Sequence, residues 1–171
     1  MEFSGWSGDI AEVETQTGTG IVHFCCDIRP FVTGGTNNSN IVFLSQGSAL
    51  VSEMGSSNLG VQFRHDGLVY ARSADHALLG SYTLNEWCHV AITLDTDTDL
   101  FDLEVSGPGI DGVLSATNLP FEENLDEVNY IMIYDDSLPP NDLGLDNVCL
   151  STASPTPMQR TTWGQVKSSY R

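Results

Sequence analysis

The property that most constrains the fold of this chain is a two-residue period of apolar side chains. In residues 21–28 (IVHFCCDI) every second side chain is apolar, and in residues 87–94 Val90, Ile92 and Leu94 alternate with more polar neighbours. A β-strand points successive side chains to opposite faces, so this is the period of a strand with one buried face. Outside the last ten residues, no stretch has a helical period. The chain is therefore predicted to be all-β.

Short strands separated by turn residues predict an antiparallel β-sandwich or jelly roll. Glycine and asparagine fill the intervening loops, as in residues 33–40 (TGGTNNSN). Strands are predicted at residues 21–28, 41–44, 59–65, 68–73, 87–94, 100–105, 129–134 and 145–150. We expect one sandwich domain at residues 1–151, a Pro/Thr linker at 152–160 (TASPTPMQR) and a basic, aromatic C-terminal tail at 161–171.

The charge of the chain is strongly negative and unevenly distributed. Of its 171 residues, 23 are acidic and six are basic, which gives a net charge of −17. All of the acidic residues but only three of the basic ones lie in residues 1–154, so this body carries −20 and the last 17 residues carry +3. Such a body repels phosphate backbones and anionic lipids, and no apolar run is long enough to span a bilayer. We therefore expect no nucleic-acid partner and no membrane insertion.

Composition favours a secreted, extracellular protein. The chain has one lysine and is rich in Ser, Thr, Asn and Gly, and its first residues lack the basic region and apolar run of a signal peptide. We expect a signal peptide that has been removed, with Met1 added as a start residue.

The four cysteines permit disulfides, and the absence of a CxxC pair excludes a zinc ribbon or a thioredoxin-like motif. Strand parity points Cys26 and Cys88 into the core. A disulfide between these two, or from Cys149 to Cys25 or Cys26, is compatible with the sequence, and parity does not choose between them.

Three segments carry a resemblance to a known family. Residues 79–107 (LGSYTLNEWCHVAITLDTDTDLFDLEVSG) resemble the central hairpin of laminin G-like domains, in which a tryptophan starts the strand and an acidic turn follows. Residues 59–72 resemble the preceding hairpin of that family, and residues 143–150 its closing strand. These domains belong to the concanavalin A-like lectin and glucanase superfamily.

The resemblance covers roughly residues 3–151 and implies two stacked sheets with a concave face able to hold a polysaccharide. It leaves the function open, because the superfamily contains lectins, adhesion modules, hydrolases and lyases. The tail at 161–171 resembles short C-terminal segments of secreted bacterial proteins that act on polysaccharides.

The register of one hairpin predicts a candidate site. A two-residue turn at Asp66-Gly67 would place Arg72 on the apolar face, where an unpaired guanidinium is costly. A three-residue turn that includes His65, with Gly67 at a positive-φ position, pairs Phe63 with Val69 instead. Side chains on the opposite face then include two of the three basic residues of the acidic body.

This face offers the groups that bind sugars. Arginine and glutamine donate hydrogen bonds to hydroxyls or to a uronate carboxylate, and a tyrosine ring stacks on sugar C–H groups. The alternative is that the two arginines only pair with surface carboxylates. The candidate ligand-binding residues are Gln62, Arg64, Tyr70 and Arg72, flanked by Trp87 and His89.

From these residues we expect an extracellular, non-catalytic carbohydrate-binding module whose partner is a polysaccharide or glycan. One alternative is a small polysaccharide-active enzyme, a lyase or glycoside hydrolase, that uses the same face. The other is a calcium-dependent adhesion module. No catalytic residue is assigned: Asp102 and Glu104 lack the third carboxylate of jelly-roll glycosidases, the sequence motifs of jelly-roll lyases are absent, and no Gly-x-Ser-x-Gly occurs.

Two acidic loops are candidates for a structural Ca²⁺. Residues 95–99 begin like an EF-hand loop but lack its glycine and its final glutamate, so a hairpin turn is expected there. The other loop clusters carboxylates that would be the metal ligands: Asp135, Asp136, Asp142 and Asp146.

Overall fold

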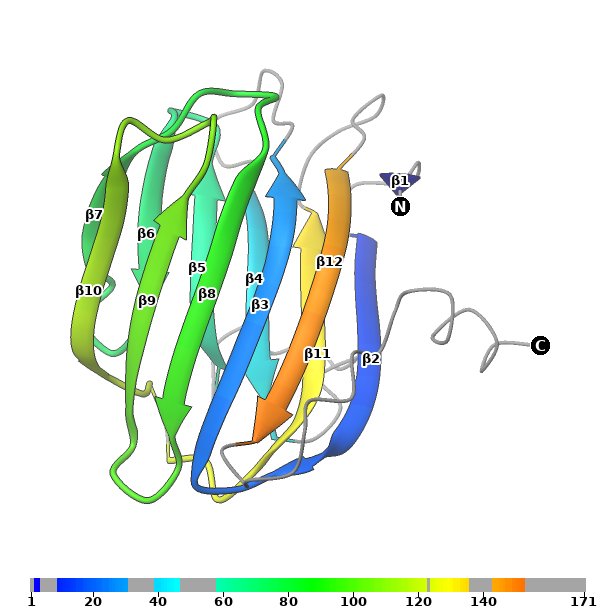
Figure 1. Ribbon diagram of the computed structural model, residues 1–171, viewed down its shortest axis with the longest axis vertical. Coiled ribbons are helices and arrows are strands. Elements are labelled where there is room, and N and C mark those ends of the chain that lie inside the picture. Colours follow the sequence, from blue (N-terminus) through cyan, green and yellow to red (C-terminus); the bar gives the residue numbers. More distant parts are fainter. Residues whose placement is uncertain are drawn as a thin grey trace.

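Two antiparallel sheets packed face to face make up the protein. The computed structural model describes residues 2–3, 9–30, 39–46, 58–122, 124–135 and 143–152. These residues form twelve strands in two six-stranded sheets, with sheet A in front of sheet B in Figure 1. None of the described residues forms a helix long and apolar enough to cross a membrane. The all-β sandwich predicted from the sequence is confirmed.

Each sheet has a simple spatial order. Sheet A contains, in that order, β1 (Glu2–Phe3), β12 (Leu143–Thr152), β3 (Ile21–Arg29), β8 (Cys88–Asp95), β9 (Leu100–Ser106) and β10 (Val113–Pro120). Sheet B contains β2 (Asp9–Gly18), β11 (Val128–Asp135), β4 (Ser39–Ser45), β5 (Asn58–Arg64), β6 (Leu68–Arg72) and β7 (Leu78–Ser81). The predicted linker beyond Thr152 and the predicted tail lie outside the described residues.

All eight predicted strands are present, and the sequence missed β1, β2, β7 and β10. These four are the two edges of each sheet. An edge strand pairs on one side only and needs less apolar surface than a central one. In β10, for example, only Leu119 is buried.

The core between the sheets takes the alternate side chains that the sequence indicates. Val22, Phe24, Cys26 and Ile28 of β3 are all at most 2% exposed, and Cys88 is also buried. Both cysteines that parity assigned to the core are therefore there, as free thiols.

The disulfide joins Cys25 to Cys149, which are cross-strand partners in β3 and β12 with Cα atoms 5.0 Å apart. Both residues lie on the outer side of sheet A. Of the pairings left open by the sequence, this one uses the outward member of the Cys25–Cys26 pair. A disulfide is consistent with an extracellular protein.

The β5–β6 hairpin has the predicted register. Phe63 pairs with Val69 across the three-residue turn, whose last member, Gly67, has φ +78°. The Gly67 N–H donates to the Arg64 carbonyl at 3.0 Å. Phe63 and Val69 are fully buried, so the intervening Arg64 is turned to the outer face of sheet B.

Gly60 lies on this outer face at a point where there is no room for a side chain. It lies in β5 directly between Phe43 of β4 and Arg72 of β6. The Arg72 guanidinium lies over the Phe43 ring, 5.3 Å from its centroid, so it reaches across the strand that carries Gly60. A Cβ atom at Gly60 would be 1.9 Å from the carbonyl oxygen of Val42.

Gly60→Ala is expected to lower the free energy of unfolding by about 3 kcal/mol or more, because the β4 and β5 backbones would have to separate. Gly112→Ala is the control: no atom lies within 4 Å of the added Cβ there, so only the cost of alanine at φ +86°, about 1 kcal/mol, is expected. Urea denaturation measures both. Equal losses of unfolding free energy in the two variants would show that the β4 and β5 backbones are not in close contact at Gly60.

Alkaline pH is expected to destabilise the protein through its buried thiols. Burial, with a smaller contribution from Glu86, raises the pKa of Cys88 from 9.0 to about 12, and burial also raises the pKa of Cys26. The unfolded thiols ionise near pH 9 while the folded ones stay neutral, so stability is full below pH 9 and falls as the pH rises toward 12.

Urea midpoints measured without reductant at several pH values test this. Above pH 9 the midpoint should fall, and it should fall less steeply in Cys88→Ser, which lacks one titrating thiol. Equal slopes would contradict the assignment of the pH dependence to Cys88.

Candidate functional site

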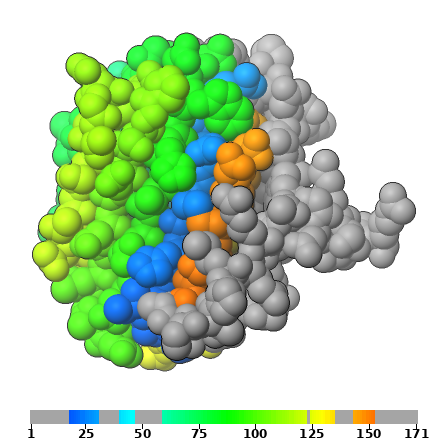
Figure 2. Space-filling view, in the orientation of Figure 1, coloured from blue at the N-terminus to red at the C-terminus, as the bar shows by residue number. Residues whose placement is uncertain are grey.

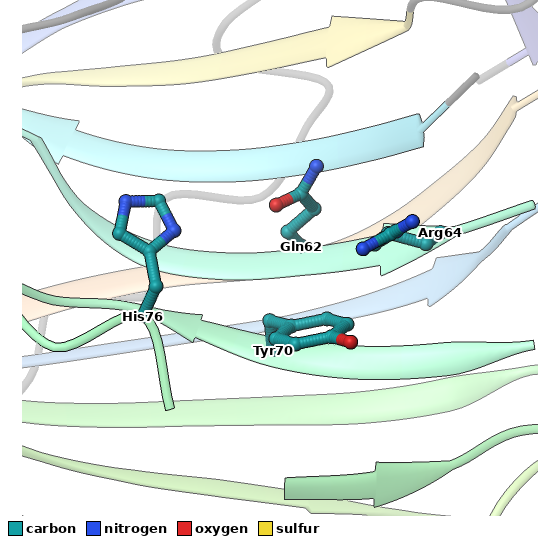
Figure 3. Close-up of a pocket in the computed structure, with 4 residues that line it drawn as sticks. All are labelled: Gln62, Arg64, Tyr70 and His76. Carbon is teal, nitrogen blue, oxygen red and sulfur yellow. The ribbon is translucent and has the colours of Figure 1, made fainter. Parts of the chain in front are cut away.

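Four polar side chains line a depression on the outer face of sheet B. Gln62 and Arg64 come from β5, Tyr70 comes from β6, and His76 comes from the turn between β6 and β7. The depression is open to solvent and has a volume of about 390 Å³. Figure 3 shows the four side chains on the same side of the two strands. Three of the predicted site residues are thus brought together.

The strand pairing accounts for three of the four positions. Gln62 and Tyr70 are directly opposite each other in the β5–β6 ladder, and Arg64 is two residues farther along β5 on the same face. Since Val61, Phe63 and Val69 fill the core, these polar residues must point outward.

Arg64 is oriented by two contacts. Its Nη2 lies 3.3 Å from a carboxylate oxygen of Asp66, with the two side chains 39% and 34% exposed. Its guanidinium also lies 5.2 Å from the centroid of the Tyr70 ring. Such an ion pair with a surface carboxylate was the alternative to sugar binding that the sequence left open for this arginine. Between side chains this exposed, it contributes at most about 1 kcal/mol. Arg64 and Tyr70 therefore form one contiguous surface at this end of the depression.

His76 is a site residue that the sequence did not indicate. It has φ +46°, its N–H donates to the Ser73 carbonyl at 3.0 Å, and its Nε2 lies 2.7 Å from Oε1 of Glu122. A carboxylate only accepts, so this contact keeps the proton on Nε2 and leaves Nδ1 of the neutral ring as an acceptor. The other oxygen of Glu122, Oε2, is buried and has no hydrogen-bond partner.

Nothing local in the sequence marks this histidine. Glu122 is 46 residues away, and the two segments meet because the Ala74 N–H donates to the Pro120 carbonyl at 3.2 Å. A left-handed residue in a Ser-Ala-Asp-His turn is a weak signal without that contact.

Arg72 lies on the same face but does not line the depression. Its guanidinium lies over Phe43, which belongs to a buried apolar cluster on this outer side of sheet B. The cluster consists of Ile41, Phe43, Met132 and Tyr134. Met132 and Tyr134 are on the outer face of β11, while Ile131 and Ile133 are in the core.

Trp87 and His89 do not flank the depression, which corrects the grouping expected from the sequence. His89 is in β8, and Trp87 is the residue directly before this strand. β8 belongs to sheet A, where it lies between β3 and β9. The outer faces of the two sheets point in opposite directions (Figure 1). Parity indicates whether a side chain points into or out of the core, but not to which sheet its strand belongs.

The calcium expectation stays a prediction. Asp136 and Asp142 lie outside the described residues, and for Asp135 only the backbone is described. Within the described part of the chain, no three His, Cys, Asp or Glu side chains are grouped as metal ligands. The loop at residues 95–99 is a hairpin turn, in which Asp95 accepts hydrogen bonds from the Asp97 N–H and the Thr98 hydroxyl.

Tyr82 supports the depression from the core side. Its hydroxyl donates to the Arg64 carbonyl at 2.8 Å, its N–H donates to the Gly67 carbonyl at 2.8 Å, and its ring packs edge-on against Phe63. The tyrosine therefore holds both ends of the turn that presents Arg64.

Tyr82→Phe is expected to lower the free energy of unfolding by about 1 kcal/mol, because it removes one buried hydrogen bond and keeps the ring. Tyr70→Phe is the matched control, since its hydroxyl faces the open depression, and its effect should stay within about 0.5 kcal/mol. Chemical denaturation measures both, and an equal loss in the two variants would contradict the supporting role of Tyr82.

No protein-family model matches the chain, and no curated protein matches its sequence. Solved structures do match its fold. A sialidase superposes with TM-score 0.63 at 12% identity, over 86% of this chain and 14% of the sialidase. The catalytic domain of a glycoside hydrolase family 131 protein from Coprinopsis cinerea gives 0.54 at 12%, over 86% of this chain and 61% of that one. Peanut lectin gives 0.53 at 9%, over 84% and 81% of the two chains.

The chain thus spans a small part of the sialidase and less than two thirds of the hydrolase domain. At these identities the likeness concerns the fold alone. With its two stacked antiparallel sheets, the protein has the concanavalin A-like lectin and glucanase fold.

Proposed function

We propose that this protein is a non-catalytic carbohydrate-binding module that holds an acidic polysaccharide in the depression on sheet B. The observation that carries the proposal is the convergence of Gln62, Arg64, Tyr70 and His76 on one open depression. Its volume is within the range of roughly 300–1,000 Å³ in which small ligands bind.

The chemistry of the lining favours a ligand rich in acceptors. Arg64 and Gln62 present N–H donors, and Tyr70 presents a hydroxyl. On a protonated His76 ring, Nδ1 is a donor as well. A uronate carboxylate would take a charge-assisted hydrogen bond from Arg64, and ring hydroxyls would take the remaining contacts.

Electrostatics restrict where an acidic chain can bind. The body at residues 1–154 carries −20, and two of its three cations lie on this face of sheet B. An anionic polysaccharide is repelled by most of the surface and attracted at Arg64 and Arg72. Such an arrangement gives specificity for one docking position more than it gives affinity.

The structural neighbours are compatible with this function but do not decide it. One of them is named a lectin and two are named a sialidase and a glycoside hydrolase. The fold thus serves both binding and catalysis on sugars.

A second candidate function is a polysaccharide lyase, and the His76–Glu122 pair is the observation that favours it. With Nε2 protonated toward Glu122, His76 has Nδ1 available to take a proton from the sugar carbon next to a uronate carboxylate. The electron pair of that C–H bond would form a C=C bond while the bond to the leaving sugar oxygen breaks, and the Tyr70 hydroxyl would protonate that oxygen.

Binding to immobilised polysaccharides tests the proposal, with uronate-containing and neutral polymers compared in the presence and absence of EDTA. Arg64→Ala is expected to weaken uronate binding about tenfold or more, because a hydrogen bond to a charged group is lost. Arg72→Ala makes the same change in charge outside the depression and should have a smaller effect.

Undiminished uronate binding by Arg64→Ala would refute the depression as the site. Release of unsaturated oligosaccharides, lost in His76→Ala, would replace the binding module by the lyase. Loss of binding in EDTA would favour the calcium-dependent alternative.

A further inference from the structure

The outer face of sheet A carries a second group of polar and aromatic side chains. Arg29 and Trp87 lie next to each other in one row across β3 and β8, and Asp27 and His89 form the next row. We call these four residues the Trp87 block. Figure 2 shows this face, with β3 in blue between β8 in green and β12 in orange. The block is separated from the depression by the whole core.

Trp87 is held in an exposed position. The Arg29 guanidinium lies 5.6 Å from the centroid of its ring, and 38% of the tryptophan is exposed. On β12, Gly144 provides the space for this pair, because a Cβ there would be 3.0 Å from Cβ of Arg29 and 3.1 Å from the Trp87 ring. The indole is fixed by packing and still reachable from solvent.

Asp27 is fixed at both carboxylate oxygens. Oδ1 lies 2.7 Å from Nδ1 of His89, and Oδ2 accepts from the side-chain amide of Asn147 at 2.5 Å. The first contact keeps a proton on Nδ1, so Nε2 of the neutral imidazole is an acceptor. The His89 side chain is 43% exposed.

A bulge in β12 and the disulfide position Asn147. The β12–β3 register shifts between Asp146 and Cys149, and Asn147 within this bulge has φ +49°. Cys149, two residues later, is tied to Cys25, two residues before Asp27. The disulfide therefore clamps the strand pair that brings Asn147 to Asp27.

The groups of the block match a neutral sugar. An exposed indole stacks on sugar C–H groups, and adjacent hydroxyls, each both donor and acceptor, fit the alternating acceptors of Asp27 and His89 and the donors of Asn147. The fixed geometry lowers the entropy lost on binding. Asp27 and Arg29 have opposite charges, so the block has no preference for an anionic ligand.

We propose that the Trp87 block is a second saccharide site, selective for neutral sugars with adjacent hydroxyls. Together with the depression, and resting on the function proposed for it, this site makes the protein bivalent, with its two sites on opposite outer faces. One molecule then bridges a uronate polysaccharide and a neutral one.

Binding of single variants to an immobilised neutral hexose polysaccharide and to a uronate polysaccharide separates the two sites. Trp87→Ala is expected to weaken neutral binding about tenfold, as loss of a central aromatic contact does, and to leave uronate binding unchanged. Leu84→Ala removes another exposed apolar side chain, 44% exposed, and should change neither. Arg64→Ala should affect only uronate binding.

A second variant tests the clamp. Replacing both Cys25 and Cys149 with serine is expected to weaken binding of the neutral polysaccharide several-fold, with uronate binding as the internal measure of an intact fold.

Bridging is tested separately. The wild type should retain the soluble neutral polysaccharide on a uronate-coated surface, and Trp87→Ala should not.

If Trp87→Ala and Leu84→Ala bind the neutral polysaccharide equally well, the second site is refuted, whether or not the depression binds the uronate polysaccharide. Loss of uronate binding in Arg64→Ala with no neutral binding in the wild type would support the depression alone and refute the block.

Discussion

The rest of the structure depends on one constraint, the burial of every second side chain between two sheets. Each large apolar side chain removed from water contributes about 1.5–3 kcal/mol, and a slip of one residue would turn that whole set outward. In β5, burial of Val61 and Phe63 therefore fixes Gln62 and Arg64 on the outer face as firmly as it fixes the core. The same holds in β3, where Cys26 and Ile28 point inward and Asp27 and Arg29 outward. The side chains on the two outer surfaces are therefore positioned by the buried apolar residues with which they alternate along each strand.

On those surfaces, the three arginines of the acidic body share one arrangement. Each guanidinium lies 5.2–5.6 Å from the centroid of an aromatic ring: Arg29 over Trp87, Arg64 over Tyr70 and Arg72 over Phe43. Two of the pairs have a glycine beside them: a Cβ at Gly60 would collide with the backbone of β4, and a Cβ at Gly144 would press on Arg29 and Trp87. A guanidinium over a ring keeps its edge N–H groups directed outward while its flat face is packed. In a body with 23 carboxylates, each of these three arginines thus also contacts an aromatic ring, and Arg64 does so while it pairs with Asp66.

How far the sequence predicts this structure depends on whether an element contributes to the core. The eight interior strands carry apolar residues in alternation or, as in β4, in a continuous run, and were predicted. The β5–β6 register was predicted too, because only one turn length keeps Arg72 out of the apolar face. The four edge strands were missed, since an edge such as β10 buries too little to show a period. The grouping of Trp87 with Arg64 was wrong for another reason. Parity is a property of one strand, whereas the assignment of β8 to sheet A depends on its pairing with β3, more than 60 residues away.

Each of the two surfaces combines a strand component that the sequence reveals with one residue that it does not. In the depression, β5 and β6 supply three side chains by parity, and His76 arrives from a left-handed turn that contacts Glu122. In the Trp87 block, β3 and β8 supply three side chains, Trp87 comes from the residue before β8, and Asn147 comes from a left-handed position in a bulge. In both places the irregular residue contacts a carboxylate, Glu122 in one case and Asp27 in the other, and this contact fixes the direction of a hydrogen bond at the site. A regular strand holds side chains at a spacing set by the backbone, so the orientation of one polar group toward a ligand has to come from a residue outside that repeat. The irregular positions are therefore the places where two surfaces of the same fold acquire different chemistry.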